Sequence, residues 1–134
     1  MRIYIDSCVF IRGILDPQAH DIHRVFLGIG PDCKLIIPRL IAKEVTRNLP
    51  INFEKRFYDL FDDHDIAEIA DEPPPKTLIR KYIDLGLREK GDAIIAAFVE
   101  MQQINCLISD NRHFLRELNT PSFTIISPAD FIQP

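Results

Sequence analysis

Apolar residues along the chain fall into two kinds of pattern that alternate with each other. The first kind is a short continuous run, which is typical of a buried β-strand. Such runs occupy residues 1–5, 34–37, 106–109 and 123–126. Residues 65–69 fit either a further short strand or the end of a helix, and the pattern does not separate the two.

The second kind of pattern has helical spacing. Residues 19–29 place Ile22, Val25, Phe26 and Ile29 on one helical face. A second helix ends before Pro50, since a proline disfavours helical backbone at the residue before it. The remaining pattern predicts helices at residues 39–49, 51–61, 76–85, 93–101 and 112–118, and Lys90-Gly91-Asp92 opens the helix at residues 93–101. Strands that alternate with helices predict an α/β fold with a short, mainly parallel sheet covered on both faces.

Composition supports one folded domain over residues 1–134. Hydrophobic residues make up 46% of the chain, which is enough to bury a core. The formal net charge is −4 at pH 7. Because affinity for nucleic acid depends largely on Lys and Arg that neutralise phosphates, any such activity must use a local basic patch, bound metal ions or a partner.

The cysteines and the N-terminal segment indicate a cytoplasmic protein. Cys8, Cys33 and Cys106 form no CxxC pair, which argues against a disulfide framework and a cysteine-rich zinc site. All three lie in or near apolar runs, so we expect buried free thiols. Residues 1–10 are interrupted by Asp6, so they do not contain the long apolar run of a signal peptide. No apolar run reaches membrane-spanning length, and we expect no membrane association.

Acidic residues stand where the predicted elements meet one edge of the sheet. Asp6 ends the first strand, Asp110 follows a later strand, Asp92 opens the most apolar helix, and Glu44 lies in the helix after the second strand. Ligands of such sheets bind outside the carboxyl ends of the strands. Clustered carboxylates repel one another unless cations neutralise them, and oxygen ligands suit Mg²⁺ or Mn²⁺.

Each acid also has a simpler interpretation. Asp6, Asp92 or Asp110 can act as a helix N-cap, since aspartate accepts hydrogen bonds from free backbone N–H groups. Glu44 by itself fits a solvated helix residue. Phosphatases that place an aspartate after their first strand need a second one two residues later, where this chain has Cys8. Receiver domains need paired acids after the first strand, which are absent here.

Five segments resemble the PIN-domain nucleases, which include the VapC-type toxins of toxin–antitoxin pairs. The segments are IYIDSCVFIRGIL, IIPRLIAKEV, KGDAIIAAFVE, LISDNRHFLREL and IISPADF. The resemblance covers nearly the whole chain. It implies a three-layer α/β/α sandwich and an endoribonuclease that uses Mg²⁺ or Mn²⁺. It also implies catalytic and metal-binding roles for Asp6, Glu44 and Asp92.

The fourth acidic position departs from the family pattern. PIN sequences often have Thr or Ser, any residue, then Asp or Asn. Aligning Ser109 places Asn111 in this position, while Asp110 lies beside it and is an alternative catalytic and metal-binding residue. An asparagine brings no charge and would weaken a second metal site. The number of metal ions, one or two, stays open.

The resemblance implies a mechanism of metal-assisted hydrolysis. Two ions about 3.5–4 Å apart can activate water and stabilise the leaving group. Ser7 and Ser109 would orient water or a carboxylate. Arg12, Lys43 and Arg112 are candidates for binding substrate phosphates, although each also fits a solvated surface charge.

Partners are expected from the same resemblance. PIN toxins commonly pair as homodimers and are bound by an antitoxin. The predicted helix at residues 51–61 carries Phe53, Phe57, Tyr58, Leu60 and Phe61. These side chains either form an interface or all pack inside the domain. The alternative function is a catalytically weak or inactive PIN-fold module that binds RNA or protein.

Overall fold

The fold is an α/β sandwich built on one five-stranded sheet. A computed structural model describes residues 1–133, apart from the side chain of Glu117. The strands are β1 (Arg2–Ile5), β2 (Lys34–Pro38), β3 (Ala67–Ala70), β4 (Cys106–Ile108) and β5 (Thr124–Ile126). They lie in the order β3-β2-β1-β4-β5, and every pairing is parallel. The predicted parallel sheet is therefore confirmed.

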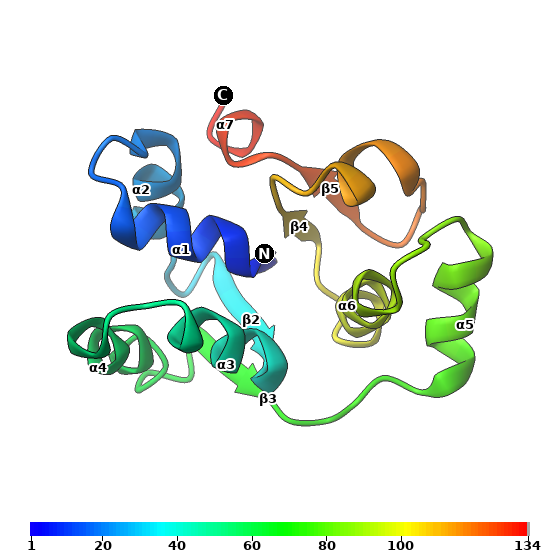
Figure 1. Cartoon of the computed structure of the whole chain (residues 1–134), viewed down its shortest axis with the longest axis horizontal. Helices are drawn as coiled ribbons and strands as arrows, with labels where there is room; N and C mark the ends of the chain where they lie inside the picture. The colour runs from blue at the N-terminus through cyan, green and yellow to red at the C-terminus, as the bar shows by residue number, and fades with distance from the viewer. Residues whose placement is uncertain (134) are drawn as a thin grey trace.

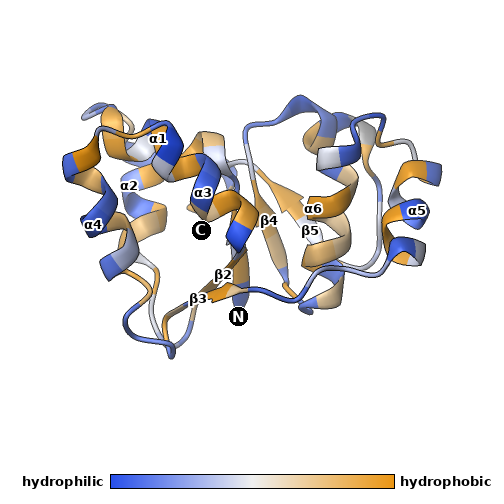
Figure 2. Ribbon diagram, turned by 60° about the horizontal axis from the view of Figure 1, so that its bottom comes forward, coloured by the Kyte–Doolittle hydropathy of each residue, from blue (hydrophilic) through white to orange (hydrophobic). Residues whose placement is uncertain are grey.

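Helices cover the sheet on its two sides (Figure 1). The first group packs together and consists of α1 (Ser7–Leu15), α2 (His20–Leu27), α3 (Arg39–Arg47), α4 (Ile51–Asp59) and the short α7 (Pro128–Phe131). On the other side lie α5 (Lys76–Asp84) and α6 (Lys90–Met101). Figure 2 shows much of α6 and of the strands β2 and β4 in the hydrophobic colours. None of the helices in residues 1–133 is long and apolar enough to cross a bilayer.

Several elements differ from the prediction. Residues 7–15 form α1, although no helix was predicted there. The undecided segment at residues 65–69 contributes to strand β3. The predicted helix at residues 112–118 is a π-helix, η1 (His113–Glu117). The expected burial of the cysteines is wrong, because Cys8 is exposed and the other two are only half-buried. Cys8 follows Ser7 at the start of α1.

The order of the strands determines where a ligand can bind. Connections from β1 to β2 and from β2 to β3 progress toward one edge, whereas β4 and β5 lie on the other side of β1. The strand order therefore reverses between β1 and β4. In open α/β sheets, such a switch point opens a crevice at the carboxyl ends of the strands. The residues that follow β1 and β4 lie at this crevice.

Candidate functional site

Asp6 stands at the switch point and is held there by hydrogen bonds. It follows β1, is only 7% exposed and caps α1 by accepting a hydrogen bond from the Ser7 backbone N–H at 3.0 Å. The Tyr4 hydroxyl donates to Oδ1 at 3.0 Å, and the Ser109 hydroxyl donates to Oδ2 at 2.8 Å. Asp6 is thus both a helix cap and a fixed carboxylate at the end of a strand.

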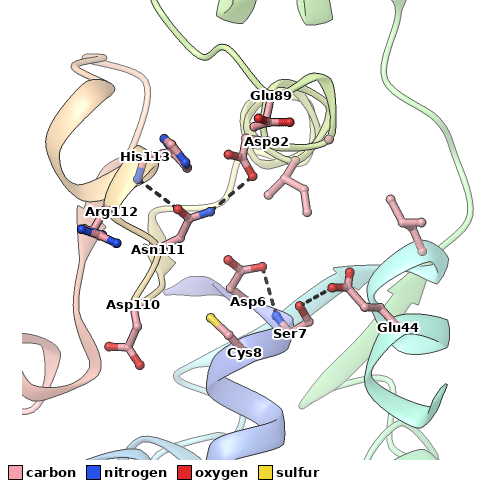
Figure 3. Close-up of a pocket in the computed structure, with 13 residues that line it drawn as sticks. Asp6, Ser7, Cys8, Glu44, Glu89, Asp92, Asp110, Asn111, Arg112 and His113 are labelled. Carbon is pink, nitrogen blue, oxygen red and sulfur yellow. Dashed lines mark hydrogen bonds between the residues drawn. The ribbon is translucent and has the colours of Figure 1, made fainter. Parts of the chain in front are cut away.

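Glu44 reaches the same edge from α3. Its Oε1 accepts a hydrogen bond of 3.0 Å from the Ser7 hydroxyl. Ser7 is buried and follows Asp6 directly, so its backbone contacts one carboxylate and its side chain another. Figure 3 shows Glu44 on the opposite side of Ser7 from Asn111. Glu44 therefore lies close to Asp6 at the edge of the sheet and is more than a solvated helix residue.

Asp92 lies in the first turn of α6 and faces Asn111. The Asn111 side-chain Nδ2 donates to Asp92 Oδ1 at 3.3 Å, and Asn111 Oδ1 accepts from the His113 backbone N–H at 2.9 Å. The Asn111 backbone N–H in turn donates to the Ser109 hydroxyl at 2.9 Å. The N-cap of α6 is Glu89, so the capping interpretation of Asp92 is wrong.

Asp110 has a different environment. Its Oδ2 accepts a hydrogen bond of 2.7 Å from Arg12, which also lies 3.7 Å from Asp21. Figure 3 shows the Asp110 carboxylate directed away from Asp6 and Asp92, while Asn111 points toward Asp92. Asp110 does not cap η1, whose N-cap is Arg112. Of the two residues proposed for the fourth position, Asn111 is the one that contacts Asp92.

These side chains line one cavity of about 710 Å³. Its wall includes the predicted residues Asp6, Ser7, Glu44, Asp92, Asp110, Asn111 and Arg112. Ser109 lies behind this wall, fully buried against Asp6. Lys43 and Arg12 are exposed and do not line the cavity, so of the three predicted phosphate-binding cations only Arg112 stands on its wall.

Sequence reasoning missed several residues of this region. Glu89, His113 and Cys8 line the cavity, and Tyr4 is fully buried beneath Asp6. A signal existed for two of them. Glu89 precedes Asp92 by three positions, and residues at the N-cap and the third helical position lie close together at the start of a helix. Tyr4 precedes Asp6 by two positions, and alternate residues of a strand point to the same side of the sheet.

Burial and charge repulsion both act on the carboxylates. Burial raises the pKa of Asp6, and the charge of Glu44 adds to the rise, while hydrogen bonds from Ser109, Tyr4 and Ser7 oppose it. Burial also raises the pKa of Asp92, with further increases from the charges of Asp6 and Glu89. The charge of His113 and the hydrogen bond from Asn111 lower that pKa. The cavity therefore favours a species that neutralises negative charge.

The carboxylates surround the cavity without converging on one point. Within residues 1–133, no three His, Cys, Asp or Glu side chains are placed to hold a metal ion together. The donor set itself is suitable for a hard cation, because Asp6, Glu44 and Asp92 offer only carboxylate oxygens. Joint binding of an ion by these residues would require their side chains to move.

Comparisons with known proteins identify the fold. No protein-family model matches the chain, and no curated protein matches it. The structure of VapBC2 from Rickettsia felis, bound to a DNA fragment from their promoter, contains a chain of similar fold, with a TM-score of 0.63 and 15% sequence identity. The match covers 95% of this chain and 98% of that chain. The chain therefore has the α/β fold of a PIN-like three-layer sandwich, as its sequence predicts.

Proposed function

We propose that the protein is a metal-dependent endoribonuclease that hydrolyses RNA phosphodiester bonds in the cavity at the end of β1 and β4. One observation carries the proposal. Asp6, Glu44 and Asp92 come from three separate elements and line one cavity, and burial and mutual repulsion raise the pKa of Asp6 and Asp92. Such repulsion costs stability unless a cation offsets it.

Mg²⁺ or Mn²⁺ is the proposed cofactor, held by Asp6, Glu44 and Asp92. These ions prefer oxygen ligands, and Mg²⁺ needs few from the protein because it keeps several waters. When bound, the ion supplies a water of lowered pKa and neutralises charge on the substrate phosphate. The Asp110 carboxylate is a weaker candidate ligand, because Arg12 already neutralises it.

The chain's own residues orient this chemistry. Ser109 and Tyr4 fix the plane of the Asp6 carboxylate, and Ser7 holds Glu44. Arg112 on the cavity wall would bind a phosphate oxygen. The attacking water forms a bond to phosphorus while the bond to the 3′ oxygen breaks and that oxygen takes up a proton. The products are a 3′ hydroxyl and a 5′ phosphate.

A toxin–antitoxin context supports the proposal further. The structure of similar fold contains VapBC2 from Rickettsia felis, and by analogy we propose that this chain acts in the cytoplasm and is held in check by an antitoxin. An apolar groove of about 360 Å³ lies between α1, α2 and α4, lined by Phe10, Phe26, Phe53 and Leu60 among others. A partner helix with apolar anchors fits such a groove.

A second candidate function is a PIN-fold module that binds RNA or protein without cutting. Asn111 favours it, since an amide stands where an acid would strengthen a metal site. The spread of the carboxylates around the cavity favours it as well.

A cleavage assay separates the two functions. The purified chain is incubated with a mixed-sequence RNA in Mg²⁺, in Mn²⁺ or in EDTA, and the ends of the products are determined. Our proposal predicts cleavage in either ion, none in EDTA, and 5′ phosphates. Binding of RNA without cleavage would support the module. Products with 2′,3′-cyclic phosphates would indicate a contaminating nuclease that uses the 2′ hydroxyl.

A further inference from the structure

A second hollow lies at the same edge of the sheet as the acidic cavity. This side pocket has a volume of about 170 Å³ and lies between the start of α3, the residues that follow β3, and α6. Its apolar wall includes Leu40, Pro73, Pro74, Ile95 and Phe98. Leu40 is 50% exposed, so its side chain covers the pocket only in part.

The side pocket adjoins the acidic cavity. Leu40 and Ile95 line both hollows. A molecule whose phosphate is bound in the acidic cavity can therefore reach these two side chains with its neighbouring group. The side pocket is continuous with the proposed site rather than a separate surface.

The chemistry of the side pocket suits a flat ring with polar edges. Its volume is below the range of about 300–1,000 Å³ that is usual for drug-sized ligands, so it fits a single ring system. Arg39 and Asp71 stand at its rim and form a paired contact, with Nε–Oδ1 2.9 Å and Nη2–Oδ2 3.2 Å. Arginine planes stack on nucleobases, and both members can hydrogen-bond a base edge.

We propose that the side pocket binds one unstacked nucleobase next to the phosphate that is cut. The inference rests on the proposed function and names its substrate class, which is single-stranded RNA. A base inside a duplex is stacked and paired and cannot enter the pocket. Apolar walls and a guanidinium plane accept different bases, because every base has a stacking face.

The test compares nucleotides with a ligand that lacks the base. Amide NMR spectra of the full chain are recorded in Mg²⁺ during titration with AMP, with UMP and with ribose 5-phosphate, none of which contains a bond to be cut. We expect all three to shift the signals of Asn111 and His113. Only the nucleotides should shift those of Leu40, Asp71 and Ile95. They should also bind about fivefold or more tightly than ribose 5-phosphate, as expected from stacking of one base.

Two variants show where the base binds. Leu40→Ala should remove the preference for nucleotides over ribose 5-phosphate, whereas Ile51→Ala should keep it. Ile51 is a matched control because it is also an exposed apolar residue near the start of a helix. If the spectrum of Leu40→Ala shows that this variant is unfolded, Arg39→Gln replaces it. Arg39 is exposed and lies at the rim of the side pocket, so this change should also remove the preference for nucleotides.

Three results would overturn the inference. The first is equal affinity for nucleotides and ribose 5-phosphate. The second is a preference for nucleotides that Leu40→Ala and Arg39→Gln leave intact. The third is a shift of the Leu40 and Asp71 signals on dilution of the protein alone, which would assign the side pocket to contact between two copies. A chain that shows the nucleotide preference but cuts no RNA would keep this site and contradict only the nuclease proposal.

Discussion

The side chain of Asn111 donates a hydrogen bond to Asp92, with 3.3 Å between Nδ2 and Oδ1. Its orientation is fixed by a second contact, because the His113 backbone N–H donates to Asn111 Oδ1 at 2.9 Å. The amide therefore presents N–H groups toward Asp92, where an acidic residue would present oxygen. This arrangement weakens the cavity as a cation site on the side of α6.

The first prediction concerns this amide. Asn111→Asp should raise the affinity for Mn²⁺ about tenfold, equivalent to about 1.4 kcal/mol, because it replaces a donor by a charged oxygen. Isothermal titration measures both the affinity and the number of ions bound. Asp110→Asn serves as the control and should change Mn²⁺ binding little, since Asp110 is paired with Arg12. A larger effect of Asp110→Asn than of Asn111→Asp would assign the fourth position to Asp110.

The second prediction is stabilisation by metal ions. An ion that binds only the folded state stabilises it by about 2.7 kcal/mol at a concentration of 100 times Kd. Mg²⁺ or Mn²⁺ should therefore raise the melting temperature by several degrees. The same titration of Asp6→Asn should produce little change. Equal shifts in both proteins would place the ion outside the cavity.

The third prediction concerns pH in the absence of metal. Burial raises the pKa of Asp92, so the folded state keeps this proton to a higher pH than the unfolded state. Stability must then fall as pH rises through the interval above the ordinary aspartate pKa of about 3.9. The Asp92→Asn variant has no carboxyl group at this position, so its stability should not fall in this way as the pH rises. Melting curves in EDTA should therefore diverge between the two proteins from about pH 4 upward, and parallel curves would exclude a raised pKa.

The fourth prediction is that the chain forms a homodimer. Phe57 and Phe61 are buried, whereas Phe53, Tyr58 and Leu60 are only half-buried. The interpretation that all five side chains pack inside the domain is therefore wrong. Ile51 on the same helix is 87% exposed. Light scattering at micromolar concentration should give the mass of a dimer, and Ile51→Asp should lower it while Leu85→Asp should not. A monomeric mass for the unchanged chain would exclude the homodimer.

The sheet and the position of Asp6 could be predicted because both depend on local pattern. Apolar runs defined the parallel strands, and an acid at the end of a buried strand must lie at an edge of the sheet. Helix α1 was not predicted, because Val9, Phe10, Ile11 and Ile14 make its sequence apolar around much of the helix and it begins directly after Asp6. Strand β3 has the sequence AEIA, in which Glu68 interrupts the kind of apolar run that marked the other strands.

The choice between Asp110 and Asn111 depends on tertiary structure. Neighbouring residues after a strand point in different directions, and a hydrogen bond from the Asn111 backbone to Ser109 determines which one faces Asp92. Tyr4 is buried in the core, and only its hydroxyl reaches Asp6. Its spacing of two residues from Asp6 places both on one side of the sheet, but the spacing does not show that a hydrogen bond joins them.

The most direct test of the nuclease proposal is RNA cleavage by the unchanged chain and by Asp6→Asn in Mn²⁺, with melting curves of both proteins in EDTA. The substitution removes one of several repelling carboxylates, so we expect an equal or higher melting temperature. We also expect cleavage to fall below detection. Asp92→Asn should behave in the same way, while Asp84→Asn, an exposed acid outside both the acidic cavity and the side pocket, should keep cutting. Full cleavage by Asp6→Asn, or loss of cleavage only through loss of the fold, would contradict the proposal.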